Sequence, residues 1–193
     1  PNFLTPAQIA EAMDVLRRHF SFAPAARLDC SIELDPRFIS PEQIGELAAA
    51  GVTRASIGVQ DFDPEVQRAV NRIQSVEQTL AIIDACRQHG LRSVNVDLIY
   101  GLPRQTLEGF SRTLDITLQA RPERLAIYGY AHLPSMFRPQ QRIDASELPA
   151  PEAKLALLQC AIDKLGQAGY VYIGMDHFAL PDDSLAVAQR SEE

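Results

Sequence analysis

The sequence predicts an α/β fold in which parallel strands form one sheet and helices cover one of its faces. Segments with helical periodicity alternate with short β-branched segments along most of the chain, as they do in βαβ units. Three successive strand segments each combine an apolar face with a small or polar face. Hydrophobic residues make up 46% of the 193 residues, which is enough for one domain with a substantial core.

Capping residues mark where several helices begin. Thr5 and Ser40 are hydroxyl N-caps followed by proline, and Gly51 ends the second helix. Pro36 ends the strand that precedes Ser40. The expected elements are helix 5–20, strand 28–35, helix 40–51, strand 54–60, helices 63–71 and 75–90, strand 92–101, helix 106–120, strand 124–133, helix 150–169 and a short β segment at 170–180.

The irregular stretch at 135–151 is the best candidate for a functional loop. The polar residues from 182 onward are expected to be frayed.

Charge and composition exclude several classes of function. A net charge of -7 argues against a nucleic-acid or anionic-membrane surface, since both need a basic face. No apolar stretch approaches the roughly 20 residues that span a bilayer. Cys30, Cys86 and Cys160 are too far apart for a clustered metal site or a disulfide framework, which indicates a reducing cytoplasm.

The polar faces of the strands predict a ligand cavity. Glu33, Gln60 and Asp97 lie late in three successive strands, at the edge where α/β sheets place their sites. An ionised carboxylate such as Asp97 is costly in a sheet interior unless it is paired. We therefore expect Asp97 to line a cavity. The alternative is that these side chains bond one another or buried water, as in an inert scaffold.

Five stretches carry a family resemblance: "IELDPRF", "SIGVQDFDPEVQRAVNR", "NVDLIYGLPRQT", "YAHLPSMF" and "GYVYIGMDHFALPDDSLAVAQR". Over nearly the whole chain the sequence resembles the oxygen-independent coproporphyrinogen III oxidases (dehydrogenases), radical S-adenosylmethionine enzymes of haem biosynthesis. The related haem chaperones share "GVQ" and "DLIYGLP" but differ around "GMDHFA", and they are the alternative.

The resemblance implies a partial (βα) barrel with parallel strands and outer helices. It also implies two cofactors, S-adenosylmethionine and a [4Fe–4S] cluster on a Cys-x-x-x-Cys-x-x-Cys loop, with an electron donor for the cluster. In the family a 5′-deoxyadenosyl radical takes a propionate hydrogen, and loss of carbon dioxide and one electron leaves a vinyl group. This happens at two propionates of coproporphyrinogen III. A cytoplasmic monomer is implied.

The chain departs from the family pattern because the cluster motif is absent. We therefore expect a piece of a longer enzyme, inactive alone: residues 1–181 as the later part of the barrel, without its first strands, and residues 182–193 as a polar tail toward a missing C-terminal domain. The strand at 29–35 would then be an uncovered edge, which predicts self-association.

The family's cofactor contacts fall on Glu33, Gln60, Arg72, Asp97 and the backbone of Ala131. Glu33 and Asp97 would accept from ribose hydroxyls or an ammonium, Gln60 can donate and accept, and Arg72 is a fork for a carboxylate unless it is a surface helix arginine. The backbone of Ala131 would read an adenine edge. No residue is assigned as a metal ligand or, with certainty, as catalytic.

Other residues leave two interpretations open. His177 follows Asp176, an arrangement in which an acid can orient an imidazole. His132 is either a site residue or a turn cap. The remaining candidates are equally core or cavity residues (Tyr100, Tyr128, Tyr130), or arginines that either attract propionates or are solvated loop charges (Arg138, Arg142).

Overall fold

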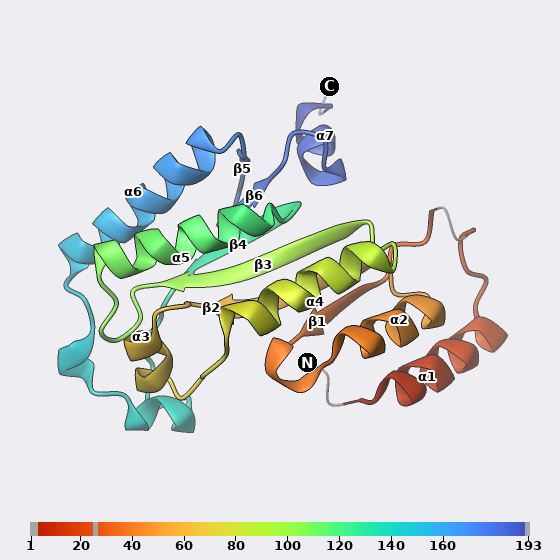
Figure 1. Cartoon of the computed structure of the whole chain (residues 1–193), viewed down its shortest axis with the longest axis horizontal. Coiled ribbons are helices and arrows are strands. Elements are labelled where there is room, and N and C mark those ends of the chain that lie inside the picture. The colour runs from red at the N-terminus through yellow and green to blue at the C-terminus, as the bar shows by residue number, and fades with distance from the viewer. Residues whose placement is uncertain (1–3, 25–26, 192–193) are drawn as a thin grey trace.

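A six-stranded sheet with strand order β1-β2-β3-β4-β6-β5 organises the chain (Figure 1). The computed structural model describes residues 4–24 and 27–191. Its strands are β1 Ser31–Leu34, β2 Arg54–Gln60, β3 Ser93–Tyr100, β4 Arg124–Gly129, β5 Val171–Gly174 and β6 His177–Ala179. Its helices are α1 Pro6–His19, α2 Pro41–Ala50, α3 Pro64–Ala69, α4 Val76–Gln88, α5 Leu107–Ala120, α6 Pro151–Gln167 and α7 Ser184–Arg190, with 3-10 turns η2 Pro36–Phe38, η3 Arg138–Arg142 and η4 Ala145–Glu147.

The predicted parallel sheet is confirmed for β1 to β4. The last two strands differ, because β6 is antiparallel to both β4 and β5. The reason is local: β5 and β6 are joined by Met175 and Asp176, which have φ of 46° and 67°. A two-residue turn with positive φ at both positions connects only antiparallel neighbours.

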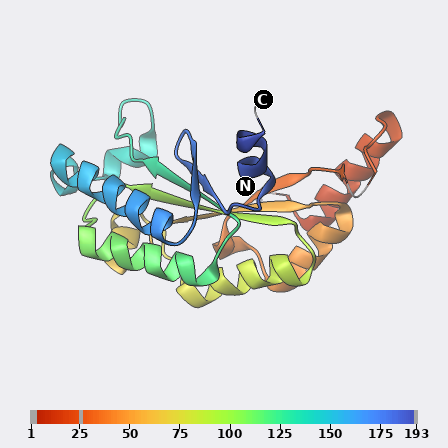
Figure 2. The same ribbon diagram turned by 90° about the horizontal axis from the view of Figure 1, so that it is seen from above.

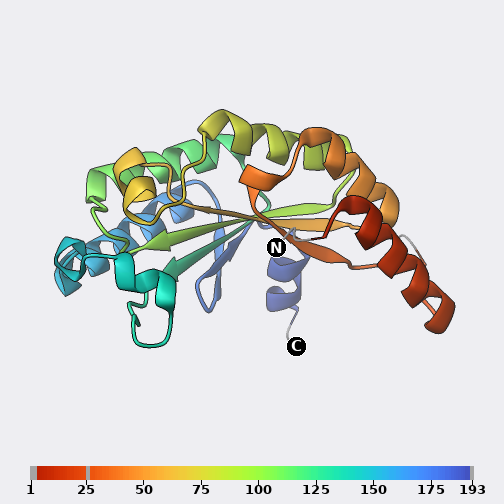
Figure 3. The same ribbon diagram turned by 90° about the horizontal axis from the view of Figure 1, so that it is seen from below.

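The two faces of the sheet have different neighbours. Figures 2 and 3 show α1, α2, α4 and α5 along one face of the curved sheet and α7 on the opposite face. The helix-covered outer face holds the core, where Ile57, Val96 and Ile127 pack with Phe110 and Leu114 in one apolar cluster. Each such side chain contributes about 1.5–3 kcal/mol by leaving water. The outer face therefore supplies stability and leaves the inner face available for polar groups.

The capping residues act as the sequence predicts. Thr5 accepts from the amide of Gln8, whose side chain bonds back to Thr5, and the same capping box joins Ser40 and Gln43. Gly51 ends α2 with φ of 110°, a left-handed conformation that favours glycine.

The expectation of a frayed stretch from residue 182 is wrong for the residues that form α7. Asp183 caps this helix by accepting from the Leu185 amide, and its side chain is only 4% exposed. The same carboxylate accepts from Arg124 Nε at 2.8 Å and from Ser93 Oγ at 3.2 Å, at the amino ends of β4 and β3. This pairing holds α7 against the sheet. Residues 192–193 lie outside the described part.

The sheet is open, with β1 at one end and β5 at the other. Four consecutive parallel strands and their outer helices make a partial (βα) barrel, as predicted. None of the helices within the described residues is long and apolar enough to cross a membrane.

Candidate functional site

Polar side chains form two rows across the inner face. In one row, Glu33 is in register with Ser56, and Ser56 with Asn95. In the next row toward the carboxyl ends, Gly58 is in register with Asp97, followed by Ala126 and His177 on β4 and β6. The prediction that the polar residues of three strands share one face is confirmed. Asp97 is less close to the edge than expected, because β3 continues for three more residues.

Asp97 is held by its two polar neighbours. Ser56 Oγ donates to one carboxylate oxygen at 2.9 Å, and Asn95 Nδ2 donates to the other at 2.7 Å. Asn95 Nδ2 also lies 2.8 Å from Ser56 Oγ. Burial raises the pKa of Asp97 above its ordinary value, against the effect of these hydrogen bonds. The interpretation in which the polar residues bond one another is therefore correct for this trio.

The hydrogen bonding of the inner face is nevertheless incomplete. Asn95 Oδ1 and Arg72 Nε are buried and have no hydrogen-bond partner among the described residues. An unpaired buried polar atom costs about 1–3 kcal/mol, so native structures seldom leave one without a ligand or water. Both atoms belong to the polar inner face around Asp97. Each therefore has hydrogen-bonding capacity that the described residues leave unused.

Arg72 lies in the loop after α3, and its side chain reaches the sheet. Its Nη2 donates to the carbonyl of Gly58 at 2.7 Å, and its Nη1 lies 3.1 Å from Asp35 Oδ2. Burial lowers the pKa of Arg72, while the charge of Asp35 opposes this shift. A Cβ at Gly58 would lie 3.0 Å from Arg72 Nη2 and 2.9 Å from Gln60 Nε2. The glycine thus lets both predicted site residues fold over the strand.

Glu33 and Tyr128 extend this polar region on its two sides. The pKa of Glu33 is raised by burial and by the charge of Asp97. Burial also raises the pKa of Tyr128, with further contributions from the charges of Asp97 and Glu33. The β1 and β4 strands are separated by two others, yet the charge of Asp97 affects the pKa of a side chain on each of them.

His177 lies at the far end of the Asp97 row. Its ring is edge-on to Tyr128, with centroids 5.9 Å apart. The expected pairing with Asp176 is wrong, because His177 Nδ1 lies 2.6 Å from the carbonyl of Met175. Asp176 is in the turn between β5 and β6. Since a carbonyl only accepts, Nδ1 carries a proton and Nε2 is the nitrogen available to the inner face.

A cavity of about 670 Å³ lies at the carboxyl ends of β2 and β3. Gln60, Arg72, Tyr130, Arg138 and Arg142 are among its lining residues, and Asp97 is not. Asp97 therefore does not line this cavity, and its predicted contact with a ligand stays a prediction. Gln60 has φ of 69°, a left-handed conformation that is uncommon for residues other than glycine and that clusters at functional sites.

Ala131 lies two residues beyond the end of β4. Its carbonyl accepts from Gln140 Nε2 at 3.0 Å, so one of its two lone pairs is already used. His132 Nδ1 lies 3.3 Å from Tyr130 Oη, which places it beside a cavity residue. Four of the five predicted cofactor contacts, Glu33, Gln60, Arg72 and Asp97, thus lie on or beside the polar inner face. Ala131 belongs to the loop after β4.

Sequence reasoning missed a second buried carboxylate, Asp61. It is 1% exposed and accepts from Thr113 Oγ1 at 2.6 Å, from Gln105 Nε2 at 2.5 Å and from the Asp63 amide at 2.7 Å. Gln105 also accepts from the Gly101 amide at 2.6 Å. Asp61 directly follows Gln60, and Gln105 therefore links this position to the turn after β3. Its position directly after Gln60, at the carboxyl end of a strand, was the available signal.

The residues do not fit an iron–sulfur cluster. Within the described residues there is no group of three or more His, Cys, Asp or Glu that could hold a metal ion. All three cysteines are free, and burial raises the pKa of Cys86 to about 12, which disfavours the thiolate that binds metals. The donors and acceptors around Asp97 and Arg72 do fit a nucleoside carrying an amino acid, such as S-adenosylmethionine.

An open, mostly parallel sheet with outer helices, a polar inner face and a cavity at the carboxyl ends of β2 and β3 defines a partial-barrel α/β enzyme. Residues 1–116 match the family model described as the Radical SAM superfamily, and the chain belongs to this superfamily. Its members use S-adenosylmethionine and a [4Fe–4S] cluster.

Similar proteins agree with this assignment. The chain is 51% identical over 189 residues to an oxygen-independent coproporphyrinogen III oxidase from Pseudomonas aeruginosa, and 50% identical over 190 residues to that of Escherichia coli. The match covers 98% of this chain and 41% of each relative. A solved structure of coproporphyrinogen III oxidase from Escherichia coli, described as a radical SAM enzyme, superposes with a TM-score of 0.95 at 49% identity, covering 98% of this chain and 43% of that one.

Proposed function

We propose that the full-length protein containing this chain oxidatively decarboxylates coproporphyrinogen III, turning two propionates into vinyl groups. The observation that carries the proposal is the match over 98% of the chain to oxidases named for this substrate. The incomplete hydrogen bonding around Asp97 and Arg72 supports a cofactor site in the same place. The predicted boundary near residue 181 stays a prediction, although α7 beyond it is paired with the barrel through Asp183 and Arg124.

The residues of this chain bind and orient S-adenosylmethionine. When bound, this cofactor supplies the radical that removes a substrate hydrogen. Asp97, oriented by Ser56 and Asn95, accepts from hydroxyl or ammonium groups of the cofactor. Arg72 offers its unpaired Nε to a carboxylate, and Gln60 lies next to it above Gly58. Glu33 supplies a second carboxylate on the β1 side.

We place the protein in the reducing cytoplasm, which suits its three free cysteines. The reaction removes electrons from the substrate, and the cluster of the full-length protein needs an electron donor. We propose that the full-length protein is a monomer. We also propose that it has no nucleic-acid or membrane partners, in line with the net charge of -7 of this chain. This chain alone is expected to be inactive.

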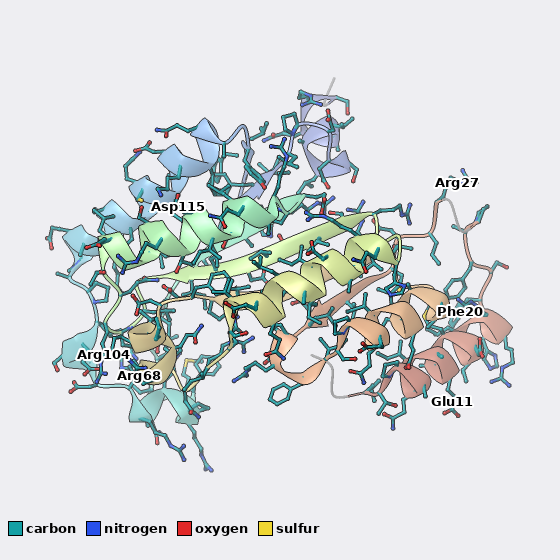
Figure 4. All side chains as sticks on the ribbon, in the orientation of Figure 1. Glu11, Phe20, Arg27, Arg68, Arg104 and Asp115 are labelled. Atoms are coloured by element: carbon teal, nitrogen blue, oxygen red, sulfur yellow. The ribbon has the colours of Figure 1, made fainter. Side chains whose placement is uncertain are left out.

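The test is anaerobic turnover by the reconstituted full-length protein. We expect carbon dioxide release from coproporphyrinogen III, and a fall of at least tenfold in kcat/KM for Asp97→Asn. Asp115→Asn is the matched control, since Asp115 lies on the outer helix α5 and pairs with Lys164 (Figure 4). Cofactor cleavage without carbon dioxide release would contradict the proposal. Stoichiometric haem binding without turnover would instead favour the haem-chaperone alternative.

A further inference from the structure

We infer that the cavity of about 670 Å³ at the carboxyl edge binds a largely apolar molecule that carries several carboxylates, and that Arg138 and Arg142 bind those carboxylates. The inference rests on the proposed function for the identity of the molecule, a tetrapyrrole with carboxylate arms. The arginines themselves are assigned from the structure. The volume is within the range of about 300–1,000 Å³ that small-molecule sites occupy.

The cavity walls come from separate parts of the chain. The ends of β2 and β3 form one side, and the residues after α3 form another. The 3-10 turn η3 forms the third through both arginines, and Ile143 directly after it adds to this wall. The irregular stretch that the sequence marks as a functional loop therefore closes a cavity over the sheet edge.

The two arginines of η3 lack protein partners. Among the described residues, neither guanidinium group has a hydrogen bond or an ion pair. Acidic residues close in sequence are engaged elsewhere: Asp144 accepts from the Ser146 amide at 2.8 Å, and Glu147 pairs with Arg104 at 2.6 Å. In a chain of net charge -7, two unpaired arginines on one cavity wall favour an anionic ligand. Guanidinium groups bind carboxylates in a bidentate manner.

The remaining walls match an apolar body. Val70, Ile99, Leu102 and Ile143 line the same cavity as the arginines. A flat ring system can bury its faces against these side chains while its charged arms reach η3. Gln60 and Arg72 line the same cavity and also belong to the cofactor-facing set. The molecule would therefore lie directly beside the cofactor.

The experiment measures binding of coproporphyrin III, the stable oxidised form of the ring, to this chain by fluorescence titration. For Arg138→Gln combined with Arg142→Gln we expect at least a tenfold rise in Kd and a weaker dependence on salt. The matched control is Arg68→Gln, which removes the same charge from α3 near the cavity but from outside its lining (Figure 4). An unchanged Kd in the double variant would overturn the inference, as would an equal rise in the control.

A second arm separates this inference from the proposed function. In the full-length protein the double variant should raise KM for coproporphyrinogen III at least tenfold, while the melting temperature stays unchanged because both side chains are exposed. Turnover with an unchanged KM would overturn the inference and leave the function standing. Arginine-dependent porphyrin binding without any decarboxylation would refute the function and leave the inference standing.

Discussion

Asp61 and Asp97 are both buried carboxylates on the same sheet, yet their surroundings differ. Three donors satisfy Asp61, and they come from α5, from the turn after β3 and from the chain just beyond β2. Asp97 has two donors from neighbouring side chains, and one of these, Asn95, has an unpaired buried oxygen. The pKa of both carboxylates is raised by burial. A completed hydrogen-bond network thus distinguishes a structural carboxylate from one prepared for a ligand.

The largest effect is expected at Asp61. Asp61→Ala leaves the Thr113 hydroxyl, the Gln105 amide group and the Asp63 amide without their acceptor, and each loss costs about 1–3 kcal/mol. We expect the free energy of unfolding to fall by about 4 kcal/mol in urea denaturation. A loss below about 1 kcal/mol would remove the structural role assigned to this network.

Asp183 is expected to have the next largest effect. Its side chain is 4% exposed and pairs with Arg124 at 2.7 Å, so Asp183→Ala should cost about 3 kcal/mol. Burial would raise the pKa of Asp183, but hydrogen bonds from Arg124 and the Leu185 amide hold it below its ordinary value. The stabilisation is therefore present above the unfolded pKa of about 3.9 and is lost as pH falls through the lower folded pKa.

Thermal unfolding against pH tests this account. The difference between the parent chain and Asp183→Ala should shrink as the solution becomes more acidic. Asp182→Ala, at the exposed neighbouring position, should change stability little at any pH. A pH-independent difference would show that the Asp183 charge is not what holds α7.

Gly58→Ala should produce a moderate effect at the site. The new methyl group would meet Gln60 Nε2 and Arg72 Nη2, which are ends of flexible side chains and can move away. We expect a stability cost of about 1 kcal/mol and roughly tenfold weaker binding of S-adenosylmethionine by calorimetry. Gly166→Ala, where a Cβ has open space, is the control. Unchanged affinity would show that Gln60 and Arg72 need not fold over the strand.

Asp97→Asn should have the smallest effect on stability, and this sharpens the contrast with Asp61. A raised pKa means that the folded state binds the proton more tightly than the unfolded state. Stability contributed by Asp97 is therefore highest below its unfolded pKa of about 3.9 and decreases as pH rises through the folded pKa. At neutral pH we expect Asp97→Asn to unfold at the same or a higher urea concentration than the parent chain. A clear loss of stability would make Asp97 structural.

Much of the fold follows from local signals in the sequence. The caps at Thr5 and Ser40, the stop at Gly51 and the alternation of strand faces all predict elements that the structure confirms. The antiparallel β6 could not be read from periodicity, because only the φ angles at Met175 and Asp176 determine the direction of the turn. The helix α7 depends on contacts between Asp183 and residues 59 and 90 positions away, which no local pattern contains.

The candidate site was predicted only in part, because local patterns show which face a side chain lies on and not which groups it contacts. Strand alternation predicted a polar face on three successive strands, with Glu33 and Asp97 on it, since this follows from a period of two. Alternation does not say which polar groups satisfy one another, so it left open whether these side chains bond one another or a ligand, and it missed the closed network at Asp61. The predicted self-association through the edge strand β1 stays a prediction, which sedimentation of the chain at increasing concentration would test.

The most direct test of the central claim, that the inner face around Asp97 is a ligand site, is calorimetric binding of S-adenosylmethionine to this chain and to Asp97→Asn. Melting temperatures of the same samples are recorded in parallel. We expect the substitution to raise Kd at least tenfold while the melting temperature stays the same or rises. Equal affinity of the two proteins, absence of binding at millimolar cofactor, or a lowered melting temperature with unchanged affinity would contradict the claim.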